Sequence, residues 1–163
     1  MPSPTQNVID FHTHVFPDAL APRAIAQLTI NAAASGYTPL TDGTVAGLLE
    51  SMSRAGISRS VICNIATNPR QMKKVNDFAI SLLEDRRLIP LGSVNPYAEE
   101  EEMITELNRL KEAGIPGIKI HPDYMKAEID SEKFTPIFKA CEERNLFVIT
   151  HAGFDPVEPN HIH

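Results

Sequence analysis

The chain has 163 residues, and 42% of them are hydrophobic, which is enough apolar material to bury the core of a single domain over residues 1–163. Its formal net charge of -6 argues against a nucleic-acid surface, because phosphate binding needs clustered lysine and arginine. No apolar run is long enough to span a bilayer, and the polar start lacks a leader-like segment. Two cysteines are too few for a disulfide framework. We therefore expect a cytoplasmic protein without membrane partners.

Short runs rich in valine, isoleucine or phenylalanine alternate along the chain with amphipathic stretches. Each run is bounded by glycine, proline or asparagine, which is typical of buried strands. A helical piece at residues 21–29 falls in an insertion, residues 17–40, that follows the first run. In chain order we predict strands at residues 8–16, 59–65, 88–94, 117–121 and 146–151, and further helices at residues 44–55, 69–87, 98–113 and 131–144.

The ends of the predicted helices carry residues that are typical of helix starts and stops. Pro69 suits the first turn of a helix, where its missing amide hydrogen costs little. Each of three predicted helices is directly followed by a residue that is typical of helix stops, namely Gly56, Gly114 or Asn145. Glycine and asparagine accept the left-handed backbone conformation that commonly ends a helix, so these positions support the predicted bounds.

The repeated strand–helix unit predicts a parallel sheet. Two architectures share this pattern, a doubly wound open sheet and a (β/α)8 barrel. No Gly-x-Gly-x-x-Gly motif follows the first strand and no Walker-type loop occurs, so nucleotide binding loses its main support. In either architecture the insertion at residues 17–40 lies above the carboxyl ends of the strands, where substrates bind.

Four histidines stand at the ends of predicted strands. His12 and His14 lie two residues apart in the first strand, so both imidazoles should project from one face and reach one cation. His121 ends the fourth strand, and His151 ends the fifth. In a barrel these strand ends meet at one mouth, where that fold carries its chemistry. Four imidazoles from three strands therefore predict a metal site rather than core filling.

The residues around these histidines resemble the motifs of a known family. Residues 9–14 (IDFHTH) are similar to the opening strand of the amidohydrolase superfamily. Residues 117–122 (GIKIHP) and 150–153 (THAG) resemble the fourth-strand and fifth-strand motifs of its aminocarboxymuconate-semialdehyde decarboxylase-related branch. The resemblance implies a TIM (β/α)8 barrel, of which this chain holds about the first five βα units. It also implies one divalent metal ion, zinc by preference, bound by His12, His14 and His151.

Two further site residues of the family have no counterpart in this sequence. Members of the family have a further histidine at strand six and an aspartate at strand eight that binds the metal and moves protons. The sequence ends at His163, before either strand is expected. Asp155 follows the fifth strand in a loop, and we do not assign it the role of that aspartate.

Lys119 and His121 are the two candidate catalytic residues. They share one face of the fourth strand, with Lys119 one alternate step deeper. In some amidohydrolases a strand-four lysine is carbamylated and bridges two metals, but we prefer a buried lysine that pairs with a carboxylate or holds substrate. His121 is expected to face substrate or to support a ligand, because in this branch the metal ligands come from strands one and five.

The function that this resemblance implies is hydrolysis of a small carbonyl, ester, lactone or amide substrate through a metal-activated water. A metal-dependent non-oxidative decarboxylase of the same branch is the first alternative. A phosphoesterase of the polymerase-and-histidinol-phosphatase type also carries Asp-x-His-x-His in its first strand but lacks the fourth-strand motif. The remaining alternative is a catalytically incomplete partial barrel with a structural or interaction role.

Five strands are too few to close a barrel of this type, which takes eight. Strands one and five should each expose an unpaired edge, and open apolar edges promote association. We therefore expect a companion fragment to supply the remaining strands or, less favoured, a homo-oligomer that packs the open edges of two copies together.

Overall fold

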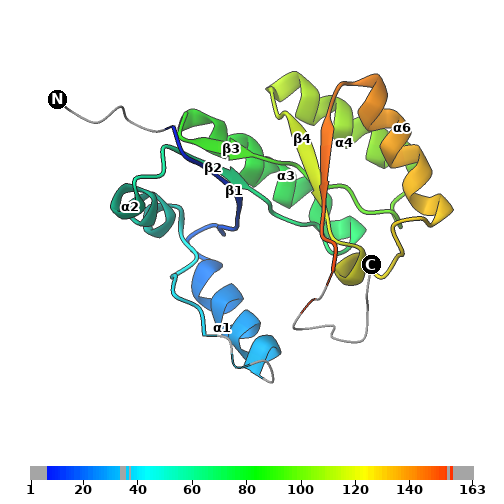
Figure 1. The fold of residues 1–163 in the computed structure, drawn as a ribbon. Coiled ribbons are helices and arrows are strands. Elements are labelled where there is room, and N and C mark those ends of the chain that lie inside the picture. Colours follow the sequence, from blue (N-terminus) through cyan, green and yellow to red (C-terminus); the bar gives the residue numbers. More distant parts are fainter. Residues whose placement is uncertain (1–6, 34–35, 37, 154, 156–163) are drawn as a thin grey trace.

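Five parallel strands form the core of the computed structural model, which describes residues 7–33, 36, 38–153 and 155 (Figure 1). Every strand lies inside a segment that the sequence predicted, but each is shorter, because regular pairing stops before the apolar run does. The strands are β1 (Ile9–Thr13), β2 (Arg59–Ile62), β3 (Leu88–Pro90), β4 (Gly117–Ile120) and β5 (Phe147–Thr150).

The strands pair in chain order, as the first strands of a (β/α)8 barrel do. β1, β2 and β3 form one parallel sheet, and β4 and β5 form a second. Gly92 joins the two sheets: its N–H donates to the Gly117 carbonyl at 3.1 Å, and its carbonyl accepts from the Lys119 N–H at 2.8 Å. The described strands therefore form one parallel series from β1 to β5.

Each of the five predicted helical segments contains a helix. The segment at residues 69–87 is divided, because two 3-10 turns, η2 (Pro69–Gln71) and η3 (Leu82–Glu84), flank its α-helix. A short helix that the sequence did not predict, α5 (Pro122–Met125), begins directly after β4. The remaining elements are α1 (Ala21–Ala32), α2 (Val45–Ala55), α3 (Met72–Ser81), α4 (Glu100–Ala113), η4 (Glu132–Phe134) and α6 (Thr135–Glu143).

Local interactions set the ends of several helices. At the start of α2, the Thr44 hydroxyl accepts a hydrogen bond from the Gly47 N–H at 2.9 Å. Gly56 and Gly114 end α2 and α4 with φ of 68° and 92°, and Asn145 follows α6 with φ of 50°. Glycine adopts this conformation without steric cost and asparagine tolerates it, so the three predicted stop positions are confirmed.

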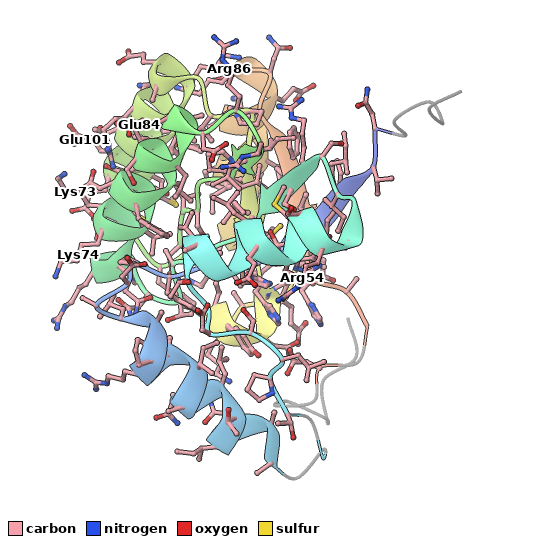
Figure 2. The ribbon with its side chains drawn as sticks, turned by 90° about the vertical axis from the view of Figure 1, so that its left-hand side faces the viewer. Arg54, Lys73, Lys74, Glu84, Arg86 and Glu101 are labelled. Atoms are coloured by element: carbon pink, nitrogen blue, oxygen red, sulfur yellow. The ribbon has the colours of Figure 1, made fainter. Side chains whose placement is uncertain are left out.

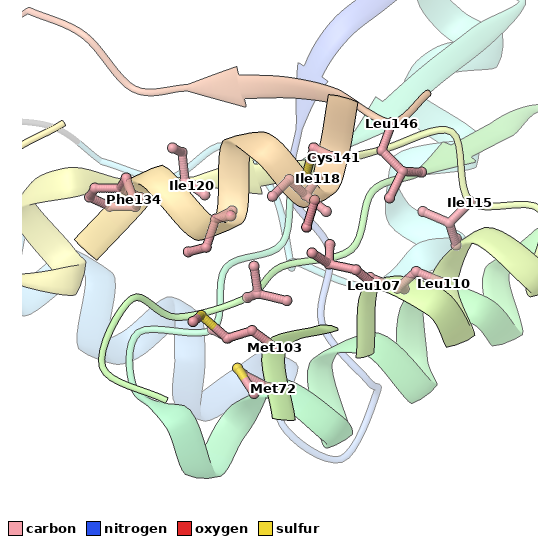
Figure 3. Packing of buried hydrophobic residues seen from close by; sticks show 14 of the residues in the cluster. Met72, Met103, Leu107, Leu110, Ile115, Ile118, Ile120, Phe134, Cys141 and Leu146 are labelled. Atoms are coloured by element: carbon pink, nitrogen blue, oxygen red, sulfur yellow. The ribbon is translucent and has the colours of Figure 1, made fainter. Parts of the chain in front are cut away.

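The two faces of the strands bury different side chains. Ile118 and Ile120 pack on the outer face against apolar side chains of α3, α4 and α6 (Figure 3). Lys119 lies between them in β4, so its side chain points to the inner face. A smaller cluster of buried apolar residues consists of Val61 in β2, Cys63 directly after β2 and Leu91 directly after β3.

Charged side chains cover the outer helices. Figure 2 shows Arg54 on α2, Lys73 and Lys74 on α3, and Glu101 on α4 directed away from the core. This is the amphipathic pattern from which the sequence predicted these helices. Within the described ranges, no helix combines the length and the apolar character that crossing a bilayer would need.

The outermost strands leave large apolar side chains accessible to water. Phe11 in β1 is 59% exposed and Phe147 in β5 is 40% exposed, whereas every residue of β4 is buried. Among the described residues, β1 and β5 each pair with one strand only. The chain thus presents two open sheet edges, which is the arrangement that the sequence predicted.

Replacing Gly92 by alanine should destabilise the fold. A Cβ atom at this position would collide with the side chain of Leu110, which is fully buried in α4 and has little room to move. Overpacking of this kind costs about 1–3 kcal/mol, and we expect a loss of that size in the free energy of unfolding measured in urea. Ser53→Ala, on the exposed surface of α2, is the control and should change stability little. A Gly92→Ala variant as stable as the wild type would show that the junction accommodates a side chain.

Candidate metal centre

His12 and His14 lie side by side where β1 ends. Their ring centroids are 5.0 Å apart, and the His12 backbone N–H donates to Asp10 Oδ1 at 3.1 Å. The register of β1 against β2 shifts between Asp10 and Thr13, and His14 lies just beyond the last residue of the strand. The two imidazoles therefore lie together at the carboxyl end of β1, next to this shift in register.

A second group forms where β4 and β5 end. His121 directly follows β4, His151 directly follows β5, and their rings stack with centroids 4.1 Å apart. Asp155 Oδ2 lies 3.2 Å from His121 Nε2 and 3.9 Å from His151 Nε2. One ligand atom from each of the three residues lies within 4.8 Å of the others, so together they could hold a metal ion.

The short helix α5 positions the ring of His121. It begins at Pro122 and turns the chain so that Tyr124 stacks on His121, with centroids 3.9 Å apart and planes 1° from parallel. His121 is therefore held between the rings of Tyr124 and His151. This three-ring stack restricts rotation of the imidazole and fixes the direction in which its nitrogens point.

Lys119 lies on the inner face, two residues before His121. It is 1% exposed, and its Nζ atom has no hydrogen-bond partner among the described residues. Burial lowers the pKa of its amine, and its positive charge in turn lowers the pKa of His12 and of His14. The amine therefore lies close enough to the first histidine pair for the groups to influence one another.

The imidazoles of His14 and His121 are uncharged at neutral pH. Burial is the main cause that lowers the pKa of His121 to about 4. The pKa of His14 is lowered in the same direction, but His14 is an exposed residue, so burial carries less weight there. The neighbouring His12 adds to the shift at His14, and His151 adds to the shift at His121. Neutral imidazole is the form that binds a metal ion, so the electrostatics of the centre favour a cation over protons.

The donor atoms of the second group suit a divalent transition metal. Within the part of the chain that the structure describes, His121 Nδ1 and His151 Nε2 are buried nitrogens without a hydrogen-bond partner. Buried polar atoms are normally satisfied, so each of these nitrogens is available to bind a ligand. Two imidazoles and a carboxylate are ligands that zinc accepts, and manganese, iron or cobalt can occupy similar sites.

The sequence-predicted residues all lie at the carboxyl ends of the strands, as expected. The structure brings His151 together with His121 and Asp155, whereas His12 and His14 form a neighbouring pair outside that close group. Asp155, to which we assigned no role, is buried at 3% exposure beside both imidazoles. The only signal for it in the sequence is a carboxylate four residues after a strand-end histidine, which is too common to single it out.

Comparisons with known proteins identify the family and the fold. The sequence profile of a family described as amidohydrolase matches residues 9–162. No curated protein is significantly similar to the chain. Several solved structures resemble it, at sequence identities low enough that the likeness concerns the fold alone.

Three of these structures show how similar they are to this chain and what they are described as. An uncharacterised TIM-barrel protein from Bordetella bronchiseptica has a TM-score of 0.68 and 19% identity over 91% of this chain and 56% of its own. A manganese-bound 5-carboxyvanillate decarboxylase variant from Novosphingobium aromaticivorans has a TM-score of 0.67 and 18% identity, over 94% and 53% of the two chains. A protein described as a probable 2-pyrone-4,6-dicarboxylic acid hydrolase from Acinetobacter baumannii has a TM-score of 0.56 and 21% identity, over 91% and 50%.

These matches confirm the expected fold. The chain is an α/β protein whose parallel strands correspond to part of a TIM barrel. It spans about half the length of the solved structures that it matches. The strand ends that carry the four histidines therefore lie at the face where barrels of this kind place their chemistry.

The metal-free chain should lose stability as the pH falls from 6.5 towards 4. The unfolded chain binds a proton at His121 near pH 6.5, whereas the folded chain does so only near pH 4, so acid favours unfolding. One such group contributes up to about 1.4 kcal/mol per pH unit. His121→Phe keeps a ring between Tyr124 and His151 but cannot titrate, so its stability, measured by urea unfolding, should depend less on pH. Equal slopes for the variant and the wild type would contradict the buried, neutral imidazole.

Proposed function

Because this chain belongs to the amidohydrolase family, we propose that it provides the metal-binding part of a metal-dependent hydrolase that acts on a small carbonyl, ester, lactone or amide substrate. The observation that carries the proposal is the convergence of His121, His151 and Asp155 at the ends of β4 and β5, beside the His12–His14 pair at the end of β1. A fully apolar core would be the cheaper way to fill this space, so the buried imidazoles support a ligand-binding role.

His151 is the common member of two possible ligand sets. The family resemblance favours His12, His14 and His151, and the short interatomic distances favour His121, His151 and Asp155. We propose that His151 binds the ion directly and that one or both of the neighbouring groups complete its coordination. Zinc suits these nitrogen and oxygen donors, and manganese, which one similar structure contains, is the alternative.

The divalent ion would supply Lewis-acid activation of a water molecule and of the substrate carbonyl. The residues of this chain would then bind and orient the substrate. His121 is held by its ring stack at the end of β4, where it would donate a hydrogen bond to a substrate oxygen or accept one from a substrate hydroxyl. Lys119, with its unpartnered amine below, can bind a carboxylate or a developing negative charge.

Non-oxidative decarboxylation is the second candidate reaction. The similarity to a 5-carboxyvanillate decarboxylase favours it, and the Lys119 amine could hold a substrate carboxylate in either reaction. The two reactions differ in their products, because only decarboxylation releases carbon dioxide. Assaying carbon dioxide release alongside acid or alcohol release from the same substrates would separate them.

We further propose that another segment completes the barrel. β1 and β5 expose Phe11 and Phe147 and keep unpaired edges, and the matching structures are about twice as long as this chain. A companion segment that supplies the remaining strands would cover these edges, and packing of two copies of this chain is the alternative. Catalysis would then belong to the completed barrel, and a partial barrel with a structural role would bind no metal.

The purified chain should bind one divalent ion, and substitution of His151 should abolish tight binding. Loss of a group that merely supports a ligand costs 10–100-fold in affinity, so His151→Ala should lose more than about 100-fold. Zinc and manganese affinities are measured by calorimetry, with bound metal checked by elemental analysis. Glu101→Gln, an exposed acid on α4, is the control for non-specific binding.

Two further pairs of variants assign the remaining ligands. His12→Ala and His14→Ala test the set that the family resemblance favours. His121→Ala and Asp155→Asn test the set that the distances favour. Unchanged affinity in all five histidine and aspartate variants would refute a metal centre at these strand ends.

The completed enzyme should depend on its metal. Hydrolysis of ester, lactone or amide substrates should disappear after treatment with a chelator and return when zinc or manganese is added. No Gly-x-Ser-x-Gly motif offers an alternative nucleophile, and burial raises the pKa of both Cys63 and Cys141, which makes their thiols poor nucleophiles. Activity that persists unchanged in chelator would contradict a metal-dependent mechanism.

A further inference from the structure

Polar contacts rather than strand pairing connect the third and fourth strands beyond Gly92. The last ladder contact in the described residues is the Lys119 N–H, which donates to the Gly92 carbonyl at 2.8 Å. The next acceptor along β4 is the Lys119 carbonyl, and it receives the Ser93 hydroxyl at 2.9 Å. Just before His121, the hydrogen bond to β4 therefore comes from a side chain and not from a backbone N–H.

Ser93 forms hydrogen bonds that connect three neighbouring segments of the sheet. Its side chain is fully buried, and its hydroxyl donates to Lys119 in β4 while accepting from the N–H of Ala66, which follows β2. Ser93 itself follows β3. One hydroxyl thus links the chain after β2, after β3 and in β4, immediately below the level of the histidines.

Asn76 extends this network into the helices. It is fully buried in α3, and its Oδ1 accepts from the Ser93 N–H at 2.8 Å, so the backbone of Ser93 is turned away from β4. Its Nδ2 donates to Glu106 Oε2 in α4 at 2.8 Å. Arg109 holds the same carboxylate through its Nη2 at 2.7 Å. The amide of Asn76 is therefore fixed from both ends.

We propose that Ser93 and Asn76 are positioning residues that set where β4 presents His121 and Lys119 at the metal centre. Neither side chain reaches the ligand atoms, so their effect passes through the Lys119 carbonyl. The Ile120 carbonyl that follows accepts from the His151 N–H at 3.2 Å, so a shift of β4 would displace both stacked imidazoles. This inference rests on the proposed metal-binding function.

The first experiment measures zinc and manganese affinity in Ser93→Ala and Ser93→Thr. The alanine variant removes the hydroxyl, and the threonine variant keeps it. Loss of a group that orients a ligand costs 10–100-fold in metal affinity, so we expect at least a tenfold loss for Ser93→Ala and recovery for Ser93→Thr. Met52→Ala is the matched control, because it weakens a separate core cluster beneath α2 and should lower the melting temperature without changing metal affinity.

The second experiment measures the stacking of the histidine rings by NMR in the absence of metal. Stacked rings shift the proton resonances of their neighbours upfield, so the histidine ring signals of the metal-free chain report the His121–His151 stack. Ser93→Ala should move these signals towards unstacked values, whereas Met52→Ala should not. If the wild type binds neither metal, the proposed function fails, and this spectroscopic comparison still tests the positioning role.

The outcomes separate positioning from simple stabilisation. A folded Ser93→Ala variant with weakened metal binding and altered ring signals supports the proposal. A variant with a lower melting temperature but wild-type affinity and ring signals overturns it. If Ser93→Ala does not fold, Ser93→Cys, which keeps the size of the side chain but weakens its hydrogen bonds to Lys119 and Ala66, replaces it. Wild-type affinity and ring signals in that variant would equally overturn the proposal.

Discussion

The backbone hydrogen bonds of Gly92 connect the strands that carry His12 and His14 to those that carry His121 and His151. These bonds are the backbone pairing between the two parallel sheets in the described residues, and they hold β3 beside β4. The junction requires glycine, because α4 packs Leu110 against the position where a side chain would begin. Beyond Gly92, side-chain hydrogen bonds from Ser93 to β4 and through Asn76 to α3 and α4 also hold β3 and β4 together. The site thus depends on how closely one helix approaches the backbone between β3 and β4.

The centre concentrates polar groups that are costly to bury. Lys119 has no described hydrogen-bond partner for its amine, and neither does one nitrogen of each of the stacked imidazoles of His121 and His151. Each unsatisfied buried group costs about 1–3 kcal/mol, a large share of the net stability of a domain. Unsatisfied groups of this kind are expected where a fold serves a ligand, because a bound cation would satisfy the imidazoles and a bound anion would satisfy the amine. The same groups would be poor choices for a protein with a purely structural role.

The sequence was most informative where side-chain periodicity decides the structure. Short runs of apolar residues bounded by glycine, proline or asparagine predicted all five strands, and Gly56, Gly114 and Asn145 correctly marked helix ends, because these signals act over a few residues. The inward position of Lys119 followed from alternation alone. The helix α5 and the approach of Asp155 to His121 depend on how loops fold back over the strand ends, which tertiary contacts determine. The shift in register of β1 against β2 was not predicted either, since a change in pairing leaves no mark on composition.

The central claim is that a divalent ion binds at the strand ends with His151 as a ligand. Anomalous diffraction from crystals grown with zinc or manganese tests it most directly, because the signal locates the metal independently of any assay. The account predicts one strong peak about 2.0–2.2 Å from a ring nitrogen of His151, with the remaining ligands drawn from His12, His14, His121 and Asp155. A peak bound only by surface residues, or no peak in the presence of excess metal, would contradict it.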